Sequence, residues 1–293
     1  MDEQSPKVFP DVEQLLEASV PRPRVPWVGL AVGVSVSMLV VAAFTGGGGE
    51  GGSGVSLFAS TVAAGMLLVL PLILRWTLSD VRAEQAAVAG LAELVQLRRW
   101  PEASAGLINL LSRPMRAMQL RSEALVYFAA VLARYHQFAQ AIELQTYLLD
   151  NEFVADGTAY GLKLGRAMAM LREGQLVDAD QALSDLRRSG PRDSGAFALV
   201  EMYRDVMTGH AEEALELFHK RLPVMREQLG HRLGDAFALA ARAYDLRGQT
   251  AEAANAFSQA TLLAPVVELC RRYPEATRLL GRYEPSPAPA EMA

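Results

Sequence analysis

Residues with side chains suited to catalysis or metal binding are few and scattered along this chain. The adjacent acids Glu212 and Glu213 begin an expected helix, where negative charge stabilises the helix dipole. The histidines show no metal-ligand spacing such as the HExxH motif. They lie in expected turns (His136 and His210) and in or after the fourth helical pair (His219 and His231). Turn, surface and helix-start roles therefore explain these residues, and no metal site is predicted.

A single cysteine and a glycine-rich loop are the remaining candidates for chemistry. Cys270 has no second cysteine to pair with, so we interpret it as a small buried hydrophobe rather than a nucleophile. The sequence GGGGEGGSG at 46–54 lacks the Lys-Ser/Thr ending of a phosphate-binding loop. No nucleophile elbow or Walker motif is present. We therefore predict no catalytic, cofactor-binding or metal-binding residue, and a protein that is not an enzyme.

The composition of the 293 residues argues against a nucleic-acid surface, because the net charge is −5. Hydrophobic residues make up 51% of the chain, which is high for a soluble protein. One region, residues 27–74, explains this excess. The rest of the chain to about residue 280 has the spacing of amphipathic helices.

Residues 237–265 form the clearest structural unit. In the first half, small residues and two aromatics recur at three- and four-residue spacing, which places them on one helical face. Gly248 ends this helix, a second apolar face follows, and Pro265 ends the second helix because proline lacks the backbone N–H. The unit is therefore expected to be a pair of antiparallel helices. Its marker residues are Phe237, Ala240, Ala241, Tyr244, Gly248, Ala253, Phe257, Ala260 and Pro265.

This spacing resembles that of the tetratricopeptide repeat (TPR) family, with Phe237 where that family usually has Trp. The central alanine of the second helix aligns with four others upstream. The series is Ala103, Ala141, Ala179, Ala214 and Ala253, with steps of 141−103 = 38, 179−141 = 38, 214−179 = 35 and 253−214 = 39. Arg98 and His136 replace the turn glycine in the first two units.

The resemblance implies an all-α fold, a TPR-like α-α superhelix of about five helical hairpins over residues 77–281. Several prolines and glycines fall near expected joints, namely Pro114, Pro191, Gly195, Pro223, Gly230 and Pro265. Residues 271–281 are expected to form a polar capping helix interrupted at Pro274, and residues 282–293 a disordered tail.

Two uncharged apolar runs, 27–45 and 55–74, flank the glycine-rich loop 46–54. Each is about long enough to cross a hydrocarbon core of roughly 30 Å. They predict a transmembrane hairpin over 27–75, so the chain resembles a TPR protein with an N-terminal two-helix transmembrane anchor. A signal peptide is an alternative for the first run, and a buried helical hairpin for both.

Positive charge predicts the orientation of that hairpin. Arg22 and Arg24 precede the first run and Arg75 and Arg82 follow the second, whereas the loop carries only Glu50. We therefore expect an integral membrane protein of the inner, cytoplasmic membrane, with both termini and the repeat domain cytoplasmic. Residues 1–26 are predicted to be a mostly disordered tail. Within it, Asp11 caps a short helix that must dock or remain disordered.

The first helix of each pair is expected to line a groove, as the resemblance implies. Its candidate partner-binding residues are Val126, Leu164, Met168, Leu199, Tyr203 and Arg242. The Lys, Asn and Arg set that clamps a peptide carboxylate in chaperone-binding members is missing here. An apolar groove suits an amphipathic helix or a hydrophobic segment. The alternative is that these residues pack inside a tightly wound superhelix.

Three functions remain open from the sequence. The first is a membrane-anchored scaffold or adaptor that binds a protein or peptide partner, with the lipid bilayer as a second partner. The second is a self-associating, autoinhibited or structural protein, in which the groove holds Phe9, Val12, Leu15 and Leu16 of its own or a neighbouring N-terminus, as in a homo-oligomer. The third is a subunit of a membrane enzyme or transporter, which is disfavoured because the apolar runs carry no charge. No cofactor and no nucleic-acid partner are expected.

Overall fold

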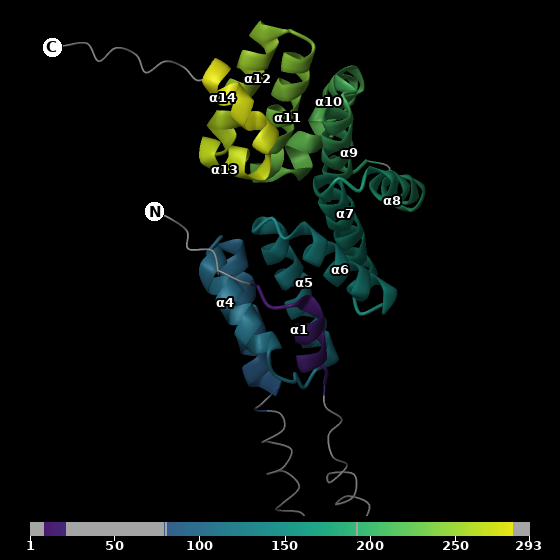
Figure 1. Cartoon of the computed structure of the whole chain (residues 1–293), viewed down its shortest axis with the longest axis vertical. Helices are drawn as coiled ribbons and strands as arrows, with labels where there is room; N and C mark the ends of the chain where they lie inside the picture. The colour runs from purple at the N-terminus through teal and green to yellow at the C-terminus, as the bar shows by residue number, and fades with distance from the viewer. Residues whose placement is uncertain (1–8, 22–78, 80, 192, 284–293) are drawn as a thin grey trace, which may run out of the picture. The chain divides into compact units, whose positions relative to one another are not determined.

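The computed structural model describes residues 9–21, 79, 81–191 and 193–283, and all regular elements in this part of the chain are helices (Figure 1). The fold class predicted from the sequence is therefore confirmed as all-α. Consecutive helices pack as neighbours in antiparallel pairs, α7 with α8, α9 with α10 and α11 with α12. The bounds are α4 Trp100–Leu111, α5 Met118–Arg134, α6 Phe138–Asp150, α7 Asp156–Glu173, α8 Leu176–Ser189, α9 Gly195–Thr208, α10 Ala211–Gln228, α11 Leu233–Leu246 and α12 Thr250–Leu263. Residues 81–96 are also helical and precede α4.

The turns inside the helical pairs share one backbone geometry. A residue with positive φ ends each first helix, and the next residue's N–H donates to the carbonyl five positions earlier, which closes the turn. In described residues these turn positions are Arg98, His136, Gly174, Gly209 and Gly248, with φ of 59°, 61°, 82°, 85° and 72°. The five aligned alanines, Ala103, Ala141, Ala179, Ala214 and Ala253, are all 0% exposed. The aligned positions therefore share turn geometry and burial in a repeat-like, all-helical fold, including the two units that lack the turn glycine.

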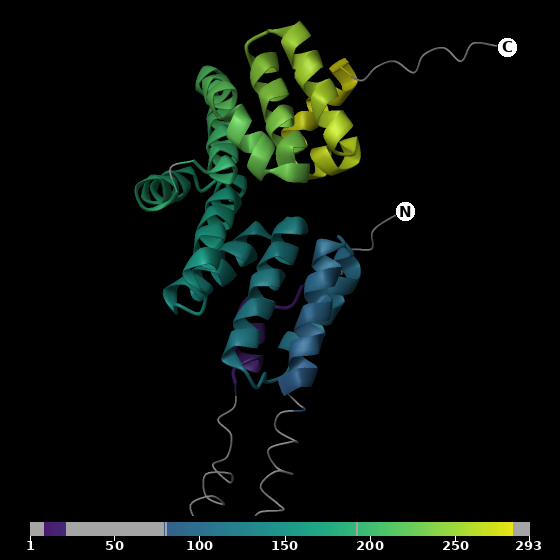
Figure 2. The same ribbon diagram turned by 180° about the vertical axis from the view of Figure 1, so that it is seen from behind.

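The chain divides into two compact units between Val131 and Leu132, inside α5. The N-terminal unit contains α1 (Val12–Ala18), which packs against α4 and lies beside α5 (Figures 1 and 2). Asp11 caps α1 as predicted, since its carboxylate accepts the Glu13 N–H at 3.2 Å.

Docking of α1 corrects the expectation of a mostly disordered tail over residues 9–21. Val12 and Leu15 are buried, and the Phe9 ring lies 6.4 Å from that of Phe128 on α5. Arg121, which is 1% exposed, donates to the Ser19 hydroxyl at 3.0 Å and to the Leu16 carbonyl at 2.9 Å, at the end of the helix where carbonyls lack partners. A seven-residue helix is too short to persist alone in water, so these contacts hold it.

The C-terminal unit is built around one large cluster of buried side chains from α7 to α14. Phe218 of α10 and Phe237 of α11 meet edge to face, with ring centroids 5.4 Å apart. Contrary to the expected joint, Pro223 lies inside α10. Proline removes one backbone donor, and here the packing of Phe218 and Met225 on either side keeps the helix continuous.

The end of the chain also differs from the expected polar capping helix. It forms α13 (Val266–Arg272), the single turn Pro274–Ala276 and α14 (Thr277–Tyr283). Tyr273 and Leu279 are buried, so this segment contributes to the core. Figures 1 and 2 show it, in yellow, against the hairpin of α11 and α12 from both sides.

The predicted localisation requires correction. Across 9–21, 79, 81–191 and 193–283, no helix is both long and apolar enough to cross a membrane, and an integral membrane protein is therefore not supported. The apolar runs 27–45 and 55–74, the loop 46–54 and the tail residues 284–293 lie outside the described residues.

Candidate partner-binding face

The first helices α7, α9 and α11 present one face of the C-terminal unit, and residues 266–283 lie on it. We call this side the first-helix face and residues 266–283 the C-terminal segment. The segment contacts α11 through each of its three helical pieces and contacts α12 through α14. The sequence left open whether the predicted groove is open or filled by the chain itself, and in the C-terminal unit the segment covers this face.

The predicted groove residues fall into two groups. Val126 belongs to the N-terminal unit and is half-buried. Four others come together in the core cluster of the C-terminal unit, with Leu199 0% and Tyr203 2% exposed, Leu164 buried and Met168 partly buried. Arg242 is half-buried and pairs with Asp245 at 2.7 Å. Their burial agrees with the alternative in which these side chains pack inside the repeat array.

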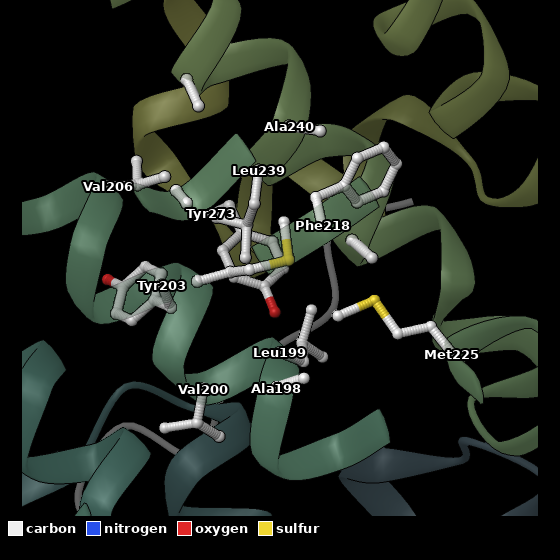
Figure 3. Close-up of a cluster of buried hydrophobic side chains, with 14 of the residues drawn as sticks. Ala198, Leu199, Val200, Tyr203, Val206, Phe218, Met225, Leu239, Ala240 and Tyr273 are labelled. Atoms are coloured by element: carbon white, nitrogen blue, oxygen red, sulfur yellow. The ribbon is translucent and has the colours of Figure 1, made fainter. Parts of the chain in front are cut away.

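An aromatic cage around Arg172 connects the first-helix face to the C-terminal segment. The guanidinium carbon of Arg172 lies 5.5 Å, 5.3 Å and 5.1 Å from the ring centroids of Phe138, Tyr203 and Tyr273. Tyr203 and Tyr273 also pack edge to face at 5.7 Å (Figure 3). Cation–π contacts contribute about 0.5–1 kcal/mol when exposed and about 2 kcal/mol when desolvated. The cage therefore helps to fix Tyr273 against α7 and α9.

Asp235 of α11 is the first of two carboxylates that receive the C-terminal segment. It is 0% exposed, and its Oδ2 accepts from Arg272 at 3.0 Å and from the Tyr273 hydroxyl at 3.4 Å, while its Oδ1 lies 2.8 Å from the same Arg272 nitrogen as an ion pair. Arg232, three residues earlier on the chain, also reaches it at 3.3 Å. A buried carboxylate needs such partners because its desolvation is costly.

Asp245 repeats this arrangement at the penultimate residue of α11. It accepts from Arg282, from the Tyr283 hydroxyl at 3.0 Å, and from Arg242 at 2.7 Å. The acids are 245−235 = 10 residues apart, and the arginines of the two Arg-Tyr pairs are 282−272 = 10 residues apart. Each acid thus binds an adjacent Arg-Tyr pair and has its own arginine three residues before it.

At neutral pH the surroundings of Asp245 keep its carboxyl ionised, and those of Tyr273 keep its hydroxyl protonated. Burial alone would raise the pKa of Asp245, but hydrogen bonds from Tyr283 and Arg282 and the charges of Arg282 and Arg242 lower it below its ordinary value. Burial, followed by the charge of Asp235, raises the pKa of Tyr273. Asp245 therefore remains an acceptor and Tyr273 remains a hydroxyl donor.

Two acids of the C-terminal segment in turn accept from donors on the repeat helices. Glu268 pairs with Arg134, at the end of α5, at 2.8 Å. Glu275 accepts the Tyr203 hydroxyl at 3.2 Å. The segment is therefore held by aromatic, acidic and basic side chains at once, which no local sequence pattern could reveal because its partners lie 37 or more residues away.

The residues that were candidates for catalysis or metal binding in the sequence form no metal-binding cluster in the described residues. The part of the chain that the structure describes contains no group of three or more His, Cys, Asp or Glu able to hold a metal ion. Cys270 is half-buried on α13. His219 shares a 2.8 Å hydrogen bond with Tyr244, on the side formed by α10 and α11.

Comparisons with protein-family models, with curated proteins and with solved structures found no match. The likeness to the TPR family consequently rests on the residue pattern, and the confirmed description is an all-helical, repeat-like fold with a covered first-helix face.

Proposed function

We propose that this chain is a TPR-like scaffold that binds a polypeptide segment on the first-helix face of its C-terminal unit. The observation that carries the proposal is that this face already holds an 18-residue polypeptide segment, Val266 to Tyr283, by side-chain contacts to α7, α9 and α11. Laying a helical segment onto a helical face is a common mode of peptide recognition.

The residue types on this face support the proposal. Tyrosine and arginine are enriched among the residues that dominate protein–protein binding energy, because each combines apolar area with directional donors. Arg172 and Tyr203 supply these types toward the C-terminal segment, while Asp245 supplies an acceptor for a basic partner. The face therefore offers both anchoring and specificity.

A photo-cross-linking amino acid at Met168 tests this function in the full chain. Met168 lies on α7 beside the core of the face, whereas Val177 on α8 is 81% exposed and serves as the matched control. Expressed in the native cells, the Met168 probe should give a discrete polypeptide adduct that the Val177 probe lacks. Adducts that are the same at both positions, or none at Met168, would reject the proposal.

An autoinhibited structural protein is the second candidate. It is favoured by the docking of α1, because Phe9, Val12 and Leu15 already cover apolar surface beside Phe128. Deleting residues 1–20 should then raise the binding of an apolar dye or change the oligomer size. If neither quantity changes, the docked helix has no closing role.

A further inference from the structure

The C-terminal segment has the features of an internal ligand whose outer end can be exchanged. Resting on the function proposed above, we propose that the partner of the first-helix face is a helical segment carrying an adjacent Arg-Tyr pair, which binds Asp245 in place of Arg282 and Tyr283. The partner is thus identified by its chemistry, a basic and an aromatic hydrogen-bond donor side by side.

The duplicated geometry carries this inference. At Asp235 and again at Asp245, one carboxylate accepts from both members of an Arg-Tyr pair. At each site one arginine nitrogen and the tyrosine hydroxyl donate to the same carboxylate oxygen, so a charge-assisted and a neutral hydrogen bond meet at one acceptor atom, and phenylalanine in place of the tyrosine would lack its donor. Two occurrences on one helix indicate a recognition element rather than an incidental surface ion pair.

The two pairs differ in how easily they can be replaced. Arg272 and Tyr273 are locked in, because Asp235 is 0% exposed and Tyr273 is held by the Arg172 cage. At the outer pair the Arg282 side chain is 62% exposed, although Asp245 beneath it is only 8% exposed. Water can therefore reach the donor, while the acceptor retains a protected and strongly binding position.

Local structure also favours release of the outer pair. α14 is only seven residues long, and its one fully buried residue is Leu279. Helices this short depend on tertiary contacts for their stability. A longer partner helix with the same Arg-Tyr pair would offer Asp245 the same hydrogen bonds together with more helical structure.

A labelled peptide provides the test with the full chain. The probe has the sequence of residues 265–283 with Cys270→Ser, and its affinity is measured by fluorescence anisotropy. Arg282→Ala should remove the charged member of the outer pair from Asp245 and tighten peptide binding about tenfold, because a larger fraction of the chain is then competent to bind. The matched control is Arg278→Ala, which removes the same charge from an exposed position on α14 and should leave the affinity at the wild-type value.

Two further variants examine the recognition itself. Asp245→Asn in the Arg282→Ala chain should abolish the gain, and a peptide with Arg282→Gln and Tyr283→Phe should bind at least tenfold more weakly. Equal affinities for the Arg282→Ala and Arg278→Ala chains, or a gain that survives Asp245→Asn, would overturn the inference.

A measurement on the wild-type chain guards against a misfolded variant. Excess peptide should speed amide hydrogen exchange in residues 277–283, and the Arg282→Gln, Tyr283→Phe peptide should not; identical exchange with both peptides contradicts the inference. Failure of the inferred Arg-Tyr recognition is distinguishable from failure of the proposed scaffold function. Adducts at Met168 without dependence on an Arg-Tyr pair would retain the scaffold and reject this partner chemistry.

Discussion

The shared turn geometry makes a sharp prediction, because the same substitution should have opposite effects at two glycines. Gly248 has φ of 72° in the turn between α11 and α12, whereas Gly161 lies inside α7 with no positive φ. A Cβ added at either position meets no atom within 4 Å. Gly248→Ala and Gly161→Ala therefore differ in backbone conformation and not in crowding.

The magnitudes follow from that difference. Alanine in the left-handed region costs about 1–2 kcal/mol, and the reduced freedom of the unfolded chain returns about 0.4–1 kcal/mol. Gly248→Ala should therefore lower the free energy of unfolding by about 1 kcal/mol. In the helix, Gly161→Ala should raise it by about 0.5–1 kcal/mol, because glycine is a poor helix former. The two variants should differ by about 2 kcal/mol.

Urea unfolding followed by far-ultraviolet circular dichroism measures both variants. With slopes of about 2–3 kcal/mol per molar, this difference corresponds to about 0.7–1 M between the two midpoints. Equal slopes are needed for this comparison. If both midpoints move in the same direction, the left-handed geometry assigned to this turn is wrong.

The remaining predictions concern other points in the fold. Arg98→Gly should raise the free energy of unfolding by about 0.5 kcal/mol and with it the melting temperature, because φ is 59° at this exposed turn and glycine adopts positive φ without strain. An unchanged or lower melting temperature would contradict this. Gly106→Ala should lower the unfolding free energy by about 1 kcal/mol in urea titration, because its Cβ would lie 2.3 Å from Leu91 Cδ2 and this overpacking outweighs the gain in helix propensity inside α4; a neutral or stabilising result would mean that Leu91 rotates away. Arg121→Met should speed hydrogen exchange in α1 at least tenfold, because two charge-assisted hydrogen bonds disappear; unchanged exchange would show that apolar contacts alone hold α1. Protection of α14 should be complete above pH of about 4, the ordinary carboxyl value, and should fall as the pH drops through the lowered pKa of Asp245, whereas Asp245→Asn should remove this pH dependence.

Most of the local structure of the described residues could be predicted from the sequence, because it depends on contacts between residues near one another in the chain. Helical periodicity and the aligned alanines located the paired helices, because small residues must occupy the positions where backbones approach closely. The same alignment placed Arg98 and His136 at turns where glycine is usual, and both adopt positive φ. The Asp11 cap was also predictable, since a cap depends only on a side chain and the amides that follow it.

Which surfaces are covered, and by which segments, could be seen only in the folded chain. Periodicity indicated that Leu199 and Tyr203 lie on an apolar face, but not that Tyr273 would pack there. The pairing of Asp235 and Asp245 with two Arg-Tyr pairs, and the continuation of α10 through Pro223, likewise depend on neighbours distant in sequence. The physical reason is that a helix's own sequence fixes which of its sides must be buried, whereas the segment that buries it is selected by contacts that form only when the whole chain folds.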